Sequence, residues 1–233
     1  MSDTIIGTMK DILTVIVGSQ AHGLATPSSD TDYHSIFIHP TSELLRVGAS
    51  PTKTSWNEGS DNWRVDDTGW ELGHFLFLAT KSNPSILECF LAPVENATED
   101  GMRLRDLFPY VWDSKLVRDA FIGYGLNQRK KYLENKDNRR PKYAAAYLRS
   151  LYQGWELLRT GTFTVRIADT PVGDTVQMFK DGLAEPGLVI ETCLGWQKAV
   201  EDAYDDPRNQ QHKPDFERIN DYLLDVRRRE WSF

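Results

Sequence analysis

The feature that most constrains the fold is a short run of apolar, mostly β-branched residues that ends at a glycine. Residues 12–17 read ILTVIV, and Gly18 follows directly. A strand with one solvated face alternates apolar and polar residues, whereas a continuous run of this length is typical of a strand buried on both faces. The run therefore predicts a strand that lies centrally in a sheet.

A second strand is predicted over residues 30–39, which read DTDYHSIFIH. Side chains two residues apart point to the same face of a strand, so this pattern places Asp30, Asp32 and His34 on one face. The connection between the two strands, residues 18–29, is polar and contains glycine and proline. Loops of this kind commonly carry functional residues.

The rest of the chain is predicted to be mainly helical. A third short strand is expected near residues 62–67, followed by helices over residues 69–81 and 84–91, with a proline in the first turn of the latter. From residue 114 onward, apolar residues recur at three- and four-residue spacing, which is typical of helices that bury one face. These later helices are expected over residues 114–134, 142–160, 172–184, 187–204 and 214–231.

This pattern predicts an α/β fold with two domains, an α/β unit over residues 1–110 and a helical bundle over residues 111–233. The net charge of -7 argues against a surface that binds nucleic acid by charge alone. Basic residues do gather in residues 129–142 and 227–229. A local nucleic-acid surface therefore stays open, although solvated helix faces account for such clusters more often.

The two cysteines, Cys89 and Cys193, are far apart and occupy apolar helical patterns, so we expect buried, reduced thiols. The apolar run at residues 12–17 is too short to cross a bilayer or to form the core of a signal peptide. We expect no membrane association and a cytoplasmic location.

Two acidic residues are the clearest candidates for chemistry. Asp30 and Asp32 would project their carboxylates side by side, and like charges this close repel each other unless a cation intervenes. Oxygen-only ligands favour Mg²⁺ or Mn²⁺, and Mg²⁺ is usually also bound by substrate phosphates. The preceding Gly18 and Ser19 would let backbone amides and a hydroxyl approach an anion closely.

A two-metal site needs a third carboxylate on a neighbouring strand. Asp66 and Asp67 are the candidates, although Glu58 competes with them. Because only one of two successive strand residues can share the face of the metals, we prefer Asp66 as catalytic metal ligand and expect Asp67 to cap the following helix.

Several cationic and histidine side chains are further candidates. Lys81 and Arg149 are candidate triphosphate contacts, although each is equally well explained as a surface cation. His34 follows Asp32 on the same predicted strand face and is a candidate nucleotide contact. His22, in the loop, stays undecided, and His74 is better explained by helix packing.

The spacing of these residues resembles a known signature. Residues 18–23, GSQAHG, and residues 29–32, SDTD, resemble the G-S-x-A-x-G…S-D-x-D signature of the DNA polymerase β-like nucleotidyltransferase superfamily. Within it, the nearest match is the RNA repair pathway DNA polymerase β family, because residues 69–76, GWELGHFL, and residues 81–88, KSNPSILE, resemble a helical segment of that family.

This resemblance implies a small mixed β-sheet flanked by helices, with Asp30, Asp32 and a third acidic residue as metal ligands and with Gly18 and Ser19 at the triphosphate. It implies transfer of a nucleoside monophosphate from a nucleoside triphosphate to an acceptor, with release of pyrophosphate. The acceptor stays open between an RNA end, a small molecule and a protein.

One departure from the family pattern supports an alternative. The family usually follows its second aspartate with an x-Arg-Gly-hydrophobic run, whereas this chain reads YHSI at residues 33–36. An arginine is therefore replaced by His34. The alternative function is a catalytically weakened, nucleotide-binding regulator or antitoxin-like protein of the same fold.

Overall fold

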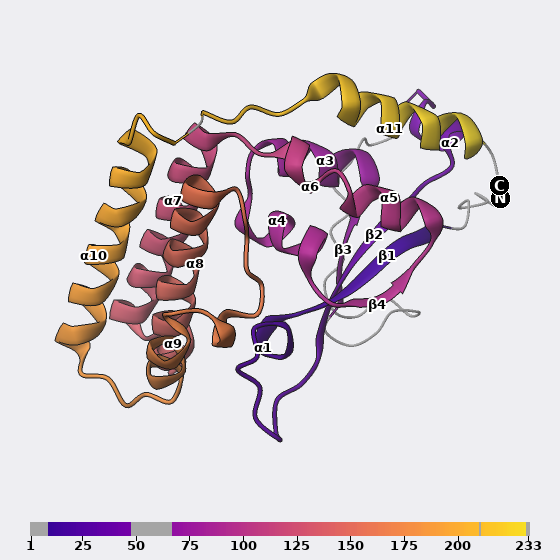
Figure 1. Ribbon diagram of the computed structural model, residues 1–233. Coiled ribbons are helices and arrows are strands. Elements are labelled where there is room, and N and C mark those ends of the chain that lie inside the picture. Colours follow the sequence, from indigo (N-terminus) through magenta and orange to yellow (C-terminus); the bar gives the residue numbers. More distant parts are fainter. Residues whose placement is uncertain (1–8, 48–66, 210, 232–233) are drawn as a thin grey trace.

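A computed structural model describes residues 9–47, 67–209 and 211–231 (Figure 1). Within these residues, a four-stranded mixed sheet is flanked by helices, and further helices follow toward the C-terminus. The strands are β1 (Lys10–Val17), β2 (Asp32–Ile38), β3 (Asp67–Glu71) and β4 (Val94–Ala97). The helices of the first half are α1 (Gly18–Ala21), α2 (Thr41–Leu44), α3 (Leu72–Thr80), α4 (Pro84–Leu91), α5 (Glu99–Arg105) and α6 (Phe108–Val111). Those of the second half are α7 (Ser114–Glu134), α8 (Arg140–Thr160), the 3-10 helix η1 (Ile167–Asp169), α9 (Gly173–Lys180), α10 (Pro186–Asp205) and α11 (Phe216–Arg229).

The strand β1 lies inside the sheet, as its apolar run predicts. The strand order is β3-β2-β1-β4, with β1 antiparallel to both of its neighbours and β2 parallel to β3. Leu13 and Thr14, which pair in regular register with Ile36 and Ser35, point to opposite faces of the sheet, yet they are only 1% and 5% exposed. Both faces of β1 are therefore covered, which confirms the prediction of a doubly buried strand.

Two of the element boundaries that differ from the sequence prediction concern the strands β2 and β3. The strand β2 begins at Asp32, so Asp30 precedes the strand instead of sharing its face. The strand β3 continues through Glu71, because Gly69 and Trp70 pair in parallel with Ser35 and Ile36 of β2. The next helix therefore begins at residue 72 and not at residue 69.

This shift also corrects the expected helix cap. Glu71 occupies the N-cap of α3, and its carboxylate accepts a hydrogen bond from the amide of Gly73 at 2.7 Å. The expectation that Asp67 caps this helix was wrong, because Asp67 is the first residue of β3. The strand β4 and the helices α5 and α6 had no counterpart among the predicted elements.

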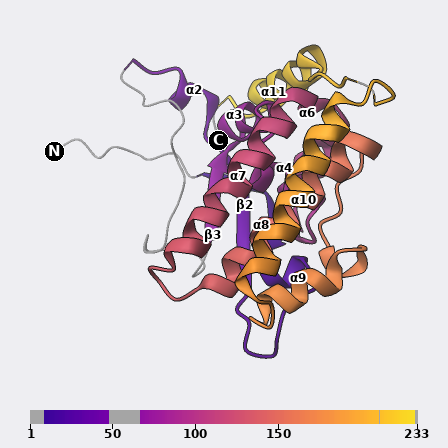
Figure 2. The same ribbon diagram turned by 90° about the vertical axis from the view of Figure 1, so that its left-hand side faces the viewer.

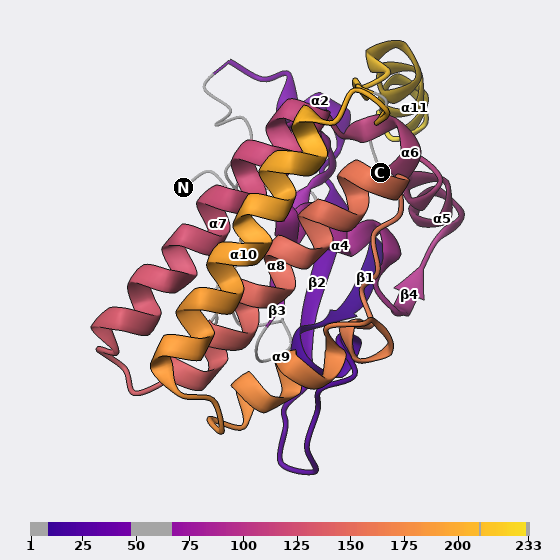
Figure 3. The ribbon, with the colours of Figure 1, turned by 60° about the vertical axis from the view of Figure 1, so that its left-hand side comes forward.

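Beside the sheet, α7, α8 and α10 lie side by side, and α9 crosses near their lower ends (Figures 2 and 3). Two glycines let α7 and α8 approach closely. A Cβ atom on Gly154 would lie 2.8 Å from the Cβ of Phe121, and one on Gly125 would lie 3.1 Å from the ring of Tyr147. The helical region predicted from residue 114 onward is thus present and tightly packed.

The last helix, α11, does not join this bundle but lies across the other side of the molecule, near α3 and α6 (Figure 1). Arg227 of α11 forms an ion pair with Glu71, which is only 1% exposed. The backbone amide of Thr41 donates to the carbonyl of Glu230 at 2.9 Å. The buried residues form one continuous apolar cluster, so the division at residue 110 stays a prediction.

Two smaller expectations also meet the structure. Cys89 and Cys193 are both free thiols and both buried, as expected. Along the described ranges, no helix combines the length and apolar content that a bilayer crossing requires.

Candidate functional site

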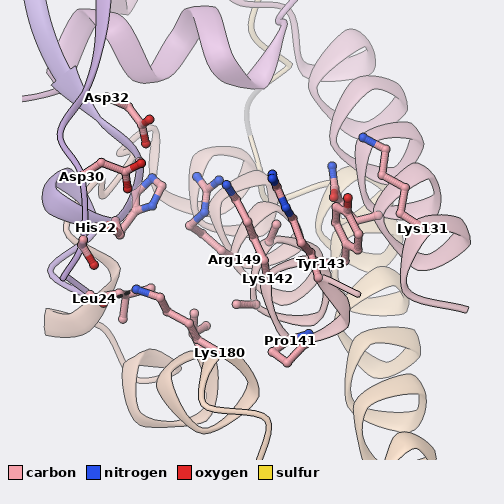
Figure 4. A pocket seen from close by; sticks show the side chains of 18 of the residues that line it. His22, Leu24, Asp30, Asp32, Lys131, Pro141, Lys142, Tyr143, Arg149 and Lys180 are labelled. Carbon is pink, nitrogen blue, oxygen red and sulfur yellow. Dashed lines mark hydrogen bonds between the residues drawn. The ribbon is translucent and has the colours of Figure 1, made fainter. Parts of the chain in front are cut away.

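A cavity of about 670 Å³ opens between the sheet and the helices α7, α8 and α9 (Figure 4). This volume is within the usual range for a small-molecule site. The sheet side contributes Gly18, Ser19, His22, Leu24, Ser29, Asp30 and Asp32. The helical side contributes mainly cationic, aromatic and small residues, described below. The predicted residues Gly18, Ser19, Asp30, Asp32 and Arg149 thus lie around one cavity.

The junction between β1 and α1 brings Gly18 directly against Asp32. Val17 pairs with Asp32 across the two strands, so the next residue, Gly18, lies beside that carboxylate. Gly18 has a φ of 65°, which favours glycine. A Cβ atom at this position would overlap a carboxylate oxygen of Asp32 and would lie 3.3 Å from its Cγ. The absence of a side chain at residue 18 therefore leaves room for the Asp32 carboxylate.

Asp30 and Asp32 share the same wall of the cavity. Asp30 is exposed and Asp32 partly buried, and Figure 4 shows both carboxylates directed toward the cavity. Their oxygens are suitable donors for a hard cation such as Mg²⁺. Among the residues that the structure describes, no three His, Cys, Asp or Glu side chains group closely enough to hold a metal ion.

The third predicted ligand is not settled by the structure. Asp66 lies outside the described residues. Asp67, the first residue of β3, pairs with Tyr33, the residue after Asp32 on β2. The chain therefore enters β3 close to the carboxylate wall, and the choice between Asp66 and Asp67 stays a prediction.

The opposite wall of the cavity is cationic. Five of the described lining residues carry a positive charge at neutral pH, namely Lys131, Arg139, Lys142, Arg149 and Lys180. Figure 4 shows Lys142, Arg149 and Lys180 facing the side that carries Asp30 and Asp32. The whole chain has a net charge of -7, so this local excess of cations runs against the overall charge. A polyanionic ligand that also binds a cation would match both walls.

Arg149 forms an ion pair with a buried carboxylate, Glu88 of α4. Its Nη1 donates to Glu88 Oε2 at 3.1 Å and to Gln153 Oε1 at 3.4 Å. Glu88, which is 7% exposed, also contacts His22 Nε2 at 2.9 Å. A carboxylate can only accept, so His22 Nε2 donates in this contact.

The pKa shifts follow from this arrangement. Burial alone would raise the pKa of Glu88, but its contacts with His22 and Arg149 outweigh burial and lower the pKa to about 2. Burial is the main cause that lowers the pKa of His22, followed by the charge of Arg149. The Glu88 carboxylate thus contacts both His22 and Arg149 and orients both side chains.

Lys180, at the end of α9, connects the helical side to the loop after α1. Its ammonium group donates to the backbone carbonyl of Leu24. Burial lowers the pKa of Lys180. This contact places a cation at the edge of the Gly18 to Ser29 loop, where no local sequence signal predicts one.

Two predicted nucleotide contacts lie away from the cavity lining. The Nδ1 of His34 lies 3.3 Å from Cys89 Sγ, and its ring meets Trp70 edge-on at 4.8 Å between centroids. Lys81 follows the end of α3, where its ammonium lies 5.3 Å from the ring centroid of Phe77. Neither residue lines the cavity, although His34 lies near enough to Glu88, the partner of Arg149, for the two side chains to interact electrostatically.

The family model described as the RNA repair pathway DNA polymerase beta family matches residues 7–177, which is more than half of the chain. The chain belongs to this family. Membership indicates a role in nucleotidyl transfer in general, without fixing the substrate, the metal or the acceptor.

Among curated proteins, one similar sequence is an uncharacterized 38.9 kDa protein of the nrdC-mobD intergenic region of Enterobacteria phage T4. It is 27% identical over 133 residues, which cover 53% of this chain and 39% of the phage protein. The match thus spans about two fifths of that relative's length. Among solved structures, a nucleotidyltransferase-like protein from Exiguobacterium sibiricum aligns at a TM-score of 0.29 with 11% identity, covering 94% of this chain and 74% of that one.

Sequence reasoning missed several lining residues. Lys131, Arg139 and Lys142 belong to the basic cluster at residues 129–142, which offered a signal that was assigned mainly to solvent. Gln128 and Lys180 carried no comparable signal. Their position in the cavity depends on how α7 and α9 pack, which no local pattern reveals.

Proposed function

We propose that this protein is a metal-dependent nucleotidyltransferase that transfers a nucleoside monophosphate from a nucleoside triphosphate to an acceptor hydroxyl, with release of pyrophosphate. The observation that carries this proposal is the pair of carboxylates, Asp30 and Asp32, that faces a cationic wall across one cavity. Family membership supports the reaction class. The acceptor is an RNA end, a small molecule or a protein, and the cavity favours none of these.

Asp30 and Asp32 would hold Mg²⁺ or Mn²⁺, with Asp66 preferred over Asp67 as the third ligand. Bound divalent cations in such sites lower the pKa of the attacking hydroxyl and neutralise the leaving pyrophosphate. Gly18 supports this arrangement because its missing side chain leaves space for the Asp32 carboxylate.

The triphosphate is assigned to Gly18, Ser19, Arg149 and Lys180. All four line the cavity, and the two cations come from α8 and α9, opposite the Gly18-Ser19 bend. Arg149 is suited to phosphate because a guanidinium presents several N–H donors in a fixed plane. Its ion pair with Glu88 fixes the side chain before a ligand arrives, so less conformational freedom is lost on binding.

The test uses Asp30→Asn and Asp32→Asn proteins incubated with labelled nucleoside triphosphates, Mg²⁺ and a panel of acceptors that includes short RNA. Changes to groups that only orient metal ligands already cost about 10- to 100-fold, so loss of a ligand itself should reduce pyrophosphate release by about 100-fold or more. Asp221→Asn is the matched control, because Asp221 is exposed on α11 and does not line the cavity. Full activity of Asp32→Asn would refute the assignment.

The alternative is a nucleotide-binding regulator that no longer transfers. The observation in its favour is His34, which replaces the usual arginine of the family and packs against Cys89 and Trp70. Tight, metal-dependent binding of a nucleoside triphosphate with no pyrophosphate release for any acceptor would support the regulator and not the enzyme.

A further inference from the structure

One buried amide in the cavity wall has no hydrogen-bond partner in the part of the chain that the structure describes. Gln128 of α7 is 5% exposed and lines the cavity, yet no hydrogen bond joins its side chain to any described residue. The other buried glutamine nearby behaves differently. Gln153 is 1% exposed, donates to the carbonyl of Thr164 at 3.0 Å and accepts from Arg149.

Gln128 is not among the side chains whose polar atoms are fully enclosed without a partner, so its amide is reached from the cavity that it lines. A primary amide can form several hydrogen bonds, and none of those of Gln128 is used by a described residue. Gln128 lines the cavity and does not lie within the apolar core. Its donor and its acceptor are therefore available to a ligand.

The wall around Gln128 is formed by the helices α7 and α8. Tyr124, Gln128 and Lys131 repeat at four and three residues, so they lie on one face of α7. From α8, Ala145 and Ala146 also line the cavity, with small apolar side chains.

The position of this wall relative to the carboxylates also matters. Figure 4 shows Lys131 on the side of the cavity that is far from Asp30 and Asp32, with Arg149 and Lys142 between them. Gln128 precedes Lys131 by three residues on the same helix face. Lys131 thus marks the α7 wall as the side of the cavity away from the carboxylates, as the base of a nucleotide is separated from its phosphates.

We propose that Gln128 reads the nucleobase of the nucleoside triphosphate, with the base seated against the α7–α8 wall. This inference rests on the proposed function. A primary amide presents one acceptor and two donors in a plane, and the edge of a nucleobase presents donors and acceptors in the same way. Gln128 is therefore a specificity residue, and the rank order of the nucleoside triphosphates depends on its side chain.

The test measures the dissociation constants of ATP, GTP, CTP, UTP and inorganic tripolyphosphate with the full chain and Mg²⁺. The wild type should prefer at least one base by about tenfold, and Gln128→Leu should lower affinity for the preferred triphosphate by about 10-fold, since a two-point amide to base contact is worth that much discrimination. The same substitution should bring the four affinities within about threefold of one another and leave tripolyphosphate binding unchanged.

A second variant and a control distinguish a specific effect of Gln128 from misfolding of the Gln128→Leu protein. Gln128→Glu keeps the shape of the side chain but removes its donors, so it should change the rank order of the four bases. Its added charge affects all four triphosphates alike and cancels in that ranking. Asn127→Leu, at an exposed neighbouring position on α7 outside the cavity, should leave every affinity unchanged.

The outcomes separate the inference from the proposed function. If the wild type binds all four triphosphates equally, or if both Gln128 variants keep the wild-type ranking, the inference is overturned while the proposed function stands. If Gln128→Leu weakens tripolyphosphate as much as every nucleotide, its role is structural and the inference also fails. If neither nucleotides nor tripolyphosphate bind the wild type, the proposed function itself fails.

Discussion

Glu88 is a buried carboxylate that the neighbouring His22 and Arg149 keep ionised. Its Oε2 accepts a hydrogen bond from Arg149 Nη1 at 3.1 Å, and its Oε1 accepts one from His22 Nε2 at 2.9 Å. The pKa is lowered from 4.5 to about 2, so the folded state binds a proton less readily than the unfolded chain does. The stabilisation is therefore present above the unfolded pKa and is lost as the pH falls toward the folded pKa.

Replacing Glu88 with glutamine should lower the free energy of unfolding at pH 7 by about 2 kcal/mol, because the partly buried Arg149 loses its counter-charge. The difference between wild type and Glu88→Gln should narrow as the pH falls from 4.5 to about 2, since Glu88 of the unfolded chain takes up a proton over that range while the folded carboxylate stays ionised until about pH 2. Urea unfolding at a series of pH values measures both effects. Glu191→Gln, at an exposed position of α10, should show neither, and a pH-independent difference for Glu88→Gln would contradict this account.

A sequence pattern predicts contacts between residues that are close along the chain, but not contacts between distant segments. Asp30 and Asp32 are two residues apart and both line the cavity, although Asp30 precedes β2 and does not share its strand face as predicted. Lys180 reaches the carbonyl of Leu24 across 156 residues of sequence, and no local pattern could indicate that contact. His34 was placed by the same two-residue period as Asp32, but a strand moves away from the site at each step, and His34 lies deeper in the sheet.

The junction between β1 and α1 leaves room for the Asp32 carboxylate. Gly18 adopts a left-handed backbone, and a Cβ atom there would overlap Asp32. Gly161, which ends α8, has a similar φ of 71° but meets nothing within 4 Å. The two glycines thus separate the cost of the backbone conformation from the cost of the overlap.

Gly18→Ala should cost about 1 to 2 kcal/mol of stability from the backbone alone and, because Asp32 must move, should reduce nucleotidyl transfer by about tenfold or more. Gly161→Ala should cost a similar amount of stability and leave activity unchanged. Thermal unfolding and initial rates of pyrophosphate release compare the two. Equal activity of both variants would show that the overlap with Asp32 has no consequence for the site.

The sequence predicted the long elements of the fold but misplaced one border between two short ones. The doubly buried β1 and the long helices of the second half were predicted because their apolar patterns are long. The border between β3 and α3 was misplaced by three residues, since a glycine at residue 69 punctuates a strand as readily as a helix start. The pairing with β2 extends β3 through Glu71, and the cap of α3 follows from that pairing.

The last helix, α11, packs against elements from the first half of the chain. It packs near α3 and α6 instead of joining the helices around the cavity (Figure 1). Arg227 pairs with the buried Glu71, and Arg229 pairs with Asp100, which is 6% exposed. None of these four residues lines the cavity, so α11 contributes to stability and not to the site.

Arg227→Met should therefore lower the free energy of unfolding by about 3 kcal/mol, because it leaves the Glu71 carboxylate buried without its partner. The double variant Glu71→Gln with Arg227→Met removes that unpaired charge and should be more stable than Arg227→Met alone. Arg228→Met, at an exposed neighbouring position, is the control and should change stability by less than about 0.5 kcal/mol. Urea unfolding distinguishes the three, and nucleotide affinity should be the same in all of them. If Arg227→Met matched Arg228→Met, the ion pair would not be what fastens α11 to the sheet, and the apolar side chains of α11, such as the buried Val226 and Ile219, would carry the contact by themselves.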